Sequence, residues 1–298
     1  MAYNAAFRTP GSASPLGRIA WAACPRSEEG IPLLVADPES YIAQMGDEWN
    51  APLDSLGFEA LCHLSRYLPQ LGESRAPLRR AIRSLLRAHL DKRVPLAVEA
   101  GCSVGPDLRA LARAADHVIG FDAYITPLRA ASVHLQGKAL AVPERQEGRS
   151  FNRSGTIRLR PAPRVSLVCG NALDPPFLAD SVDVVLAINL VDNVPNPIDL
   201  IGQLDAILKP GGLLIVASPF NWIDTITSPS EQLGGGLDPA FEGMDSPEAL
   251  RQLLRGKTPY HQHLDHKILG TQNVPWTLQE HNRCRVSYKV HVLASRKG

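Results

Sequence analysis

Residues able to bind a small charged ligand are spaced along the middle of the chain. An apolar run contains the acidic residue Glu99 and leads into Ala-Gly-Cys-Ser-Val-Gly, 100–105. The two glycines of this loop let backbone approach a ligand closely, and the Glu99 carboxylate can face an ammonium group. Asp122 lies 21 residues after the first of these glycines, at a position where a carboxylate can accept both hydroxyls of a ribose. This spacing predicts a pocket for a nucleoside that also carries amino and carboxyl groups.

Three later elements extend the pattern. Gly170-Asn171-Ala172 offers a side-chain amide that can hydrogen-bond an adenine. Asn189 ends another apolar run, beneath the place where a reactive group would be held. A Lys-Pro-Gly-Gly turn, 209–212, then precedes a further apolar run.

Alternating strands and helices must position these residues. The apolar periodicity predicts strands at 95–100, 117–121, 165–169, 182–188, 213–217 and 284–294. It predicts helices at 58–68, 77–90, 107–115, 126–135 and 197–208. Strands separated by helices form a parallel sheet with right-handed crossovers, and ligands bind such a sheet beyond the carboxyl ends of its strands. An arginine-rich segment, 136–164, interrupts the alternation as an insertion, with a possible hairpin at 150–159.

Together these elements resemble class I S-adenosylmethionine (SAM)-dependent methyltransferases. The resemblance implies an α/β, doubly wound, Rossmann-like seven-stranded sheet in residues 91–298, preceded by a helical and irregular N-terminal extension with lid helices in residues 1–90. It implies SAM as cofactor, S-adenosylhomocysteine as product and no metal. The cofactor-binding residues that it implies are Glu99, Gly101, Cys102, Ser103, Gly105, Asp122, Asn171, Ala172 and Asn189.

Other interpretations of the 101–105 loop remain open. A NAD site needs a second and a third glycine, where this chain has Ser103 and Pro106. The same loop matches the G-x-S-x-G pattern of hydrolases, in which Ser103 would be the nucleophile. The third interpretation is a protein of the SAM-binding fold that has lost catalysis and binds as a partner or scaffold.

A narrower resemblance follows the fourth strand. Asn189-Leu-Val-Asp192, Ser218-Pro-Phe-Asn-Trp222, Ser228-Pro229 and Gly234-Gly235 are similar to the methyltransferase domain of ovothiol biosynthesis, which methylates an imidazole nitrogen of mercaptohistidine. Where that family has a basic residue, this chain has Asn193. The resemblance implies a small-molecule acceptor with an imidazole, heteroaromatic or amino-acid-like nitrogen. O- or C-methylation of a natural-product intermediate is the alternative.

The candidate catalytic residues lie after the fourth and fifth strands: Asn189, Asp192, Trp222 and Asp224. Methyl transfer from a sulfonium is an in-line displacement, so aligning the acceptor provides much of the acceleration. Asp192 or Asp224 could hold an ammonium or an imidazole N–H, and Trp222 could stack on a flat acceptor. Alternatively, Trp222 packs beneath its loop and Asp192 caps the next helix.

Composition limits the classes of function. The 298 residues carry a formal net charge of +1, which does not favour a nucleic-acid partner, although Arg79, Arg80, Arg83 and Arg87 could form a local basic face. Five scattered cysteines favour a reducing compartment over a disulfide framework. With neither a signal peptide nor a membrane span apparent, we expect a cytoplasmic protein with no membrane partner. The histidine-rich stretch 260–266 is interpreted as a polar loop or strand edge rather than a metal site.

Overall fold

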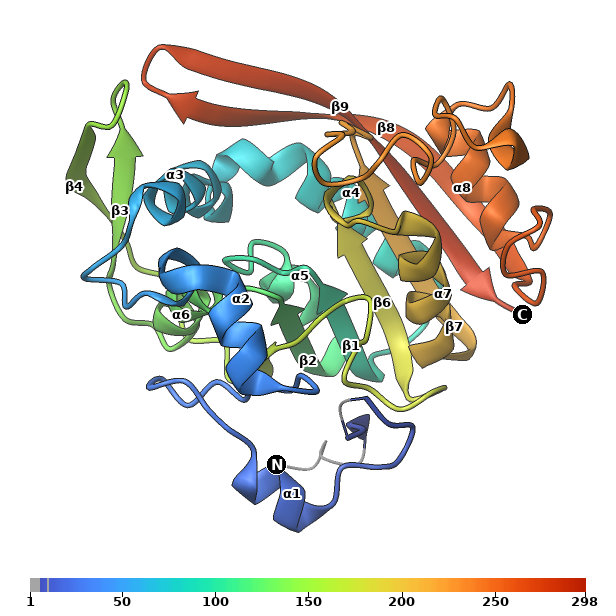
Figure 1. The fold of residues 1–298 in the computed structure, drawn as a ribbon, viewed down its shortest axis with the longest axis horizontal. Coiled ribbons are helices and arrows are strands. Elements are labelled where there is room, and N and C mark those ends of the chain that lie inside the picture. The colour runs from blue at the N-terminus through green and yellow to red at the C-terminus, as the bar shows by residue number, and fades with distance from the viewer. Residues whose placement is uncertain (1–5, 10) are drawn as a thin grey trace.

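The central strand β1, Val94–Ala100, is buried from Leu96 onward, as expected of a run that is apolar except for Glu99. In the computed structural model, which describes residues 6–9 and 11–298, it lies between two parallel neighbours. These are β2, Ala115–Asp122, and β6, Val182–Ile188. Their carboxyl ends meet at one edge of the sheet, because parallel strands run in the same direction (Figure 1).

Seven strands form the sheet, in the order β5-β2-β1-β6-β7-β9-β8. The remaining strands are β5 (Val165–Cys169), β7 (Leu208–Ser218), β8 (His266–His281) and β9 (Cys284–Lys297). β9 runs antiparallel to β7. The predicted doubly wound, seven-stranded α/β fold and its antiparallel terminal strand are therefore confirmed.

Helices cover both faces of the sheet. The helices are α1 (Arg18–Ala23), α2 (Pro38–Asn50), α3 (Phe58–Tyr67), α4 (Ala76–His89), α5 (Leu108–Leu111), α6 (Ile125–Leu135), α7 (Pro197–Ile207) and α8 (Ser246–Leu254). One apolar core joins α7, α8 and the N-terminal segment to one face, and a second joins α4, α5 and α6 to the other. A third, smaller cluster packs α3 against Val104 of the 101–105 loop and against the insertion.

The insertion is a separate hairpin made of β3 (Leu140–Arg145) and β4 (Phe151–Ile157). Its tip meets the tip of the long β8–β9 hairpin, where the Asn282 N–H donates to the carbonyl of Arg145 at 3.0 Å. α3 lies beside both hairpins: Ser65 Oγ accepts from the Arg145 N–H at 2.9 Å, and Arg66 pairs with Glu280 at 2.6 Å. The N-terminal helices are thus tied by polar contacts to two distant parts of the chain (Figure 1).

Some predicted elements differ from the structure. The helix expected at 107–115 is wrong, because α5 ends at Leu111 and the chain must turn to begin β2 at Ala115. The segment 30–35 makes two isolated bridges, an antiparallel one between Arg26 and Pro32 and a parallel one between Leu33 and Cys169. α2, α8 and β8 were not expected. β8 contains Gly270 and Pro275 and is only partly buried, so its apolar alternation is weak.

None of the helices within residues 6–9 and 11–298 is both long and apolar enough to cross a bilayer. All five cysteines are free thiols, and three of them are buried.

Candidate active site

The loop after β1 is curled by residues with positive φ. Gly101 and Gly105 have φ of 66° and 71°, and Ser103, with a Cβ, has φ of 49°. A Cβ added at Gly101 would lie 2.7 Å from Leu190 Cδ1, so a side chain there would force Leu190 to shift and would also strain the backbone at this positive φ. The Ser103 N–H donates to Asp122 Oδ2 at 2.8 Å, which holds the loop against the end of β2.

Asp122 is 9% exposed, at the carboxyl end of β2. Its other oxygen accepts from the Tyr124 N–H at 3.0 Å. Burial raises the pKa of this carboxyl, and the hydrogen bonds from Tyr124 and Ser103 oppose the rise. Because each carboxylate oxygen has two lone pairs, Asp122 can still accept from a ligand.

Glu99 lies on the neighbouring strand and is 1% exposed. Its Oε2 is buried and has no hydrogen-bond partner among the described residues. Burial, and next the charge of Asp107, raise the pKa of Glu99 well above its usual range, while Arg75 opposes the rise. Glu99 is thus a buried acid that lacks the cation needed to stabilise its charged form.

Arg75 ends a short 3₁₀ turn, Glu73–Arg75, just before α4, and forms a buried ion pair with Asp107. Its Nε and Nη2 both lie 2.7 Å from Asp107 Oδ2, and both side chains are almost fully buried. Asp107 Oδ1 is buried without a partner. This pair fixes the start of α4 to the segment that follows the 101–105 loop.

Asn189 ends β6 with a φ of 54°. Both its Oδ1 and its Nδ2 are buried without a hydrogen-bond partner in the described part of the chain. Leaving a buried polar atom unpaired costs about 1–3 kcal/mol. β6 pairs with β1, so the two unsatisfied side chains, Asn189 and Glu99, belong to adjacent strand ends.

Asn171 and Ala172 follow β5, as predicted. Asn171 Oδ1 accepts from the Leu173 N–H at 2.9 Å, and Ala172 packs against the core. Asn171 also borders a hollow of about 200 Å³ beside Tyr41 at the start of α2. Cys102, also among the predicted cofactor residues, is buried against β2 instead, and its N–H donates to the Phe121 carbonyl at 3.0 Å.

Aromatic side chains of α2 and α3 cover this edge of the sheet. Trp49 stacks on Tyr124 with centroids 4.6 Å apart, and the Tyr41 hydroxyl donates to the Ala123 carbonyl at 3.1 Å. His63 Nε2 shares a 2.7 Å hydrogen bond with Ser103 Oγ, so α3 is bonded directly to the loop. Sequence patterns did not single out these residues, because the helical periodicity reported only their apolar neighbours.

The His63–Ser103 pair bears on the hydrolase interpretation. Burial lowers the pKa of His63 to about 3, so its imidazole is neutral and a weak base. The other ring nitrogen, Nδ1, is oriented by no hydrogen bond from a described residue. The imidazole ring packs between Trp49 and Tyr67. A nucleophile needs a base that is itself oriented and has a pKa near neutrality. The geometry therefore favours a structural link over a catalytic pair.

The predicted catalytic residues are spread over two loops. Asp192 is buried, and its oxygens accept from Ser218 Oγ at 2.9 Å and from the Asn221 N–H at 2.8 Å. It does not cap α7, since Asn196 does so. Asp192 therefore joins the loop after β6 to the loop after β7. Burial raises its pKa, and these hydrogen bonds oppose the rise.

Trp222 and Asp224 make other contacts. Trp222 Nε1 donates to Ser246 Oγ at 3.1 Å, at the start of α8, and its ring packs on the core. Asp224 is exposed and accepts from Gln232 Nε2 at 3.0 Å. No contact joins either residue to Glu99 or Asp122 within the described ranges, so their part in catalysis stays a prediction.

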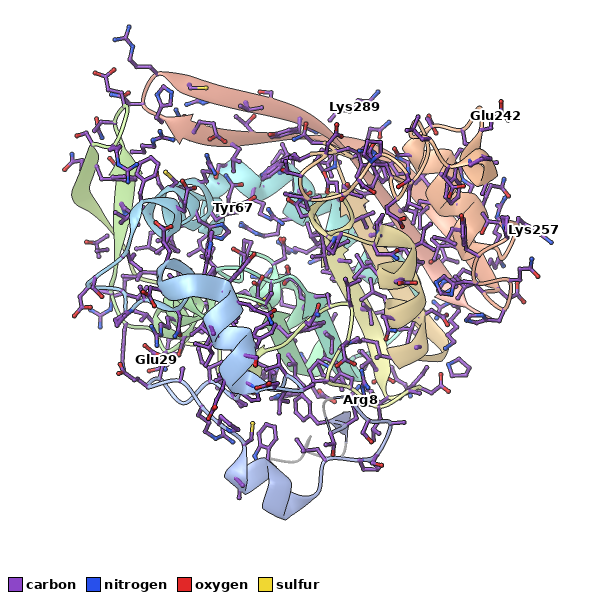
Figure 2. The ribbon with its side chains drawn as sticks, in the orientation of Figure 1. Arg8, Glu29, Tyr67, Glu242, Lys257 and Lys289 are labelled. Atoms are coloured by element: carbon purple, nitrogen blue, oxygen red, sulfur yellow. The ribbon has the colours of Figure 1, made fainter. Side chains whose placement is uncertain are left out.

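The phenols of Tyr67 and Tyr288 lie within electrostatic reach of Asp192. Burial is the main cause of the raised pKa of both phenols, and the Asp192 charge adds to it. Tyr67 is the last residue of α3 (Figure 2), and Tyr288 stacks on Trp276 of β8 with centroids 5.2 Å apart. These residues bring the N-terminal helices and the β8–β9 hairpin to the same region, which no local sequence pattern could show.

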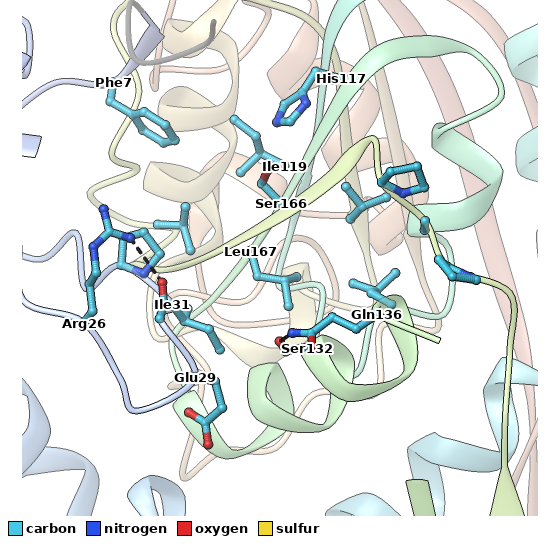
Figure 3. Close-up of a pocket in the computed structure, with 18 of the residues that line it drawn as sticks. Phe7, Arg26, Glu29, Ile31, His117, Ile119, Ser132, Gln136, Ser166 and Leu167 are labelled. Carbon is cyan, nitrogen blue, oxygen red and sulfur yellow. Dashed lines mark hydrogen bonds between the residues drawn. The ribbon is translucent and has the colours of Figure 1, made fainter. Parts of the chain in front are cut away.

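The most voluminous of the described cavities lies elsewhere. It measures about 560 Å³ and follows the outer edge of β5, between Leu167, Ile31 and Gln136 (Figure 3). Because the ligand-binding edge of such a sheet is at the carboxyl ends of its strands, this cavity is not the candidate site.

The histidine-rich stretch forms a loop, 260–265, that leads into β8. His266 is buried and bonds Asp205 and Ser295 at 2.9 Å each, which ties β8 to α7 and β9. No group of three or more His, Cys, Asp or Glu side chains in residues 6–9 and 11–298 is arranged to hold a metal ion.

Comparison with known proteins identifies the family of this chain. A 24-methylenesterol C-methyltransferase from Oryza sativa subsp. japonica is 28% identical over 131 residues, 43% of this chain and 29% of that protein. A ubiquinone biosynthesis O-methyltransferase from Actinobacillus pleuropneumoniae is 27% identical over 122 residues, 41% of this chain and 44% of that protein. The chain thus spans less than half the length of these relatives.

A SAM-dependent methyltransferase structure from Aquifex aeolicus aligns with 81% of this chain and 99% of its own, at 11% identity and a TM-score of 0.46. The methyltransferase domain family model matches residues 73–281, well over half of the chain, and includes the 101–105 loop, Asp122 and Asn189. The chain therefore belongs to the methyltransferase domain family.

Proposed function

We propose that this protein transfers a methyl group from SAM to a small-molecule acceptor at the carboxyl edge of β1, β2 and β6. The observation that carries the proposal is a set of buried polar atoms without hydrogen-bond partners among the described residues, at the ends of the adjacent strands β1 and β6. Glu99 Oε2 and both polar atoms of the Asn189 side chain are buried without partners among residues 6–9 and 11–298. A ligand with a cation and hydrogen-bonding groups would satisfy them, and SAM carries both, so the residues present fit this cofactor.

Each residue has a role that follows from its position. Glu99 would bind the ammonium group, and Asp122 would accept the ribose hydroxyls beside the Ser103 and Tyr124 amides. Asn171 would bond the adenine from the end of β5. When bound, SAM supplies a methyl group on a sulfonium, which makes that methyl electrophilic.

The chain's remaining task is to orient an acceptor and exclude water. Asn189 lies at the end of β6, where its amide can hydrogen-bond an acceptor or the cofactor. Asp192 hydrogen-bonds across the two loops that flank this position. It would therefore orient the acceptor by positioning these loops as well as by its own charge. A neutral nitrogen acceptor needs an available lone pair and a late proton acceptor more than a strong base.

We infer that residues 1–90 form an extension whose helices cover the site, and that residues 91–298 form the methyltransferase domain. The support is the contact of α3 with the 101–105 loop through His63 and that of α2 with Tyr124 through Trp49. A cover of aromatic side chains, most of them partly buried, favours a small acceptor over a macromolecular one. Trp222 and Asp224 are proposed only as residues of the acceptor loops.

An imidazole, heteroaromatic or amino-acid-like nitrogen is our first choice of acceptor atom, based on the resemblance of 189–192 and 218–222 to mercaptohistidine methyltransferases. O- or C-methylation is the alternative, and the two curated relatives described above carry such names.

The test is SAM turnover against histidine, thiohistidines, aromatic amino acids, phenols and quinone precursors. Methylation of an imidazole supports the first choice, whereas turnover of phenols or quinones alone would replace it with the alternative. If the purified protein binds no SAM in equilibrium dialysis, the proposed function itself is wrong.

A further inference from the structure

A basic hollow lies at the opposite edge of the sheet from the candidate site. It has a volume of about 250 Å³ and is bordered by five basic residues and one acidic residue, Asp91. The basic residues are Arg83, Arg87, Lys92, Arg93 and Arg113. Since the whole chain carries a net charge of only +1, this concentration of positive charge is local.

Three segments converge to build the hollow. Arg83 and Arg87 are one turn apart on α4 and so share a face. Lys92 and Arg93 precede β1, and Arg113 lies in the turn before β2. The hollow is therefore near the amino ends of β1 and β2. β1 has seven residues, so it separates this hollow from the Glu99 edge by ~20 Å.

The positive charges are largely uncompensated. Arg93 pairs with Asp116 at 2.9 Å, but no ion pair is recorded for Arg83, Arg87, Lys92 or Arg113 within the described ranges. Arg113 is the main cause of a lowered pKa at Arg83, which shows how closely the like charges approach. An adjoining hollow of about 460 Å³ shares Arg113 and adds Arg109, Arg160 and Arg164, with no acidic residue in its lining.

We propose that this basic hollow is a binding site for a small, phosphate-rich anion, such as a di- or triphosphate. Guanidinium groups match phosphate oxygens in a bidentate geometry, and a hollow lined by one sign of charge concentrates counter-ions. Its volume is slightly below the ~300–1,000 Å³ of drug-sized ligand pockets, which fits a compact anionic group. The lining has no aromatic side chain, so it offers no platform for stacking single-stranded bases.

The test is calorimetric titration of the full chain with inorganic tripolyphosphate at 50 and 200 mM NaCl. The double variant Arg83→Gln/Arg113→Gln should bind at least tenfold more weakly than the unmodified protein. The matched control, Arg255→Gln/Lys257→Gln, removes two exposed positive charges beyond α8 and should change the affinity less than twofold. Thermal unfolding of both variants checks that they fold.

Further arms separate a local site from other causes. Asp122→Ala should leave tripolyphosphate affinity unchanged, because Asp122 belongs to the opposite edge. Equal losses in the two double variants would mean that net charge alone attracts the anion, and would overturn the proposal. Absence of tripolyphosphate binding would also overturn the proposal. This holds even if anionic vesicles or duplex RNA bound to the protein in a manner that depended on Arg83.

Discussion

The buried Arg75–Asp107 pair provides a test of how the N-terminal extension is joined to the methyltransferase domain. We predict that Arg75→Ala destabilises the protein by about 3–5 kcal/mol, because it leaves a carboxylate buried without its cation. Both side chains are almost inaccessible to water, with exposures of 3% and 0%, so solvent cannot take the place of the guanidinium. Asp107 Oδ1 already lacks a partner among the described residues. Glu99 lies close to this pair, and Arg75 opposes the rise in its pKa.

Urea denaturation followed by circular dichroism measures this loss, with Arg80→Ala as the control from the exposed face of the same helix. The double variant Arg75→Met/Asp107→Leu should recover much of the stability, since replacing a buried pair by apolar groups of similar volume is often neutral or stabilising. If Arg75→Ala cost no more than Arg80→Ala, the ion pair would contribute nothing. The cover would then be held by apolar packing and by its other polar contacts, such as His63–Ser103 and Arg66–Glu280.

Three further predictions concern the candidate site. Asp122→Ala should weaken SAM binding at least about tenfold in equilibrium dialysis, a loss of about 1.4 kcal/mol; unchanged affinity would show that the ribose contact is misplaced. Glu99 should bind SAM in its charged form. The affinity for SAM should therefore increase as the pH rises above about 4.5 and through the raised pKa of Glu99 in the folded protein, and Glu99→Gln should flatten this pH dependence. Over the same window the ligand-free protein should lose stability, because its native state holds the Glu99 proton more tightly than the unfolded state does. His63→Phe keeps an aromatic ring but removes the hydrogen bond to Ser103. It should lower the free energy of unfolding by about 0.5–1.5 kcal/mol and accelerate SAM dissociation in stopped flow. Ser103→Ala should have the same effect, and the double variant should lose no more than either single variant. Hydrolysis of model esters that Ser103→Ala abolishes would instead revive the hydrolase interpretation.

The parallel part of the sheet could be predicted from sequence because its information is local. A strand buried on both faces is mostly apolar, and 95–100 and 182–188 have this property apart from one acidic residue each, Glu99 and Asp183. The positive φ of Gly101 and Gly105 likewise follows from the absence of a Cβ. These local features are sufficient to predict Glu99 and Asp122 at neighbouring strand ends.

Elements at the periphery gave weaker signals. β8 is a half-exposed strand interrupted by Gly270 and Pro275, and its pairing with β9 provides order that its own sequence does not indicate. α2 contains Gly46 with φ of 71°, a kink that breaks its helical periodicity. The helix predicted from 107 was too long, because apolar and alanine-rich periodicity continues into a turn whose position is set by the start of β2.

The contacts that enclose the site were not predictable because their partners are far apart in the chain. His63 and Ser103 are 40 residues apart, and Arg66 and Glu280 are 214 apart. Neither partner has a distinctive local pattern, and a hydrogen bond between them exists only after three segments have folded against each other.

The same argument explains why the cofactor follows from the sequence more readily than the acceptor. The cofactor residues follow consecutive strands of a recurrent sheet, whereas the surroundings of Asp192 combine the end of α3, the loop after β7 and the β8–β9 hairpin. Substitution of Tyr67 or Tyr288 should therefore change acceptor KM more than SAM affinity, and an equal effect on both would place these tyrosines at the cofactor instead.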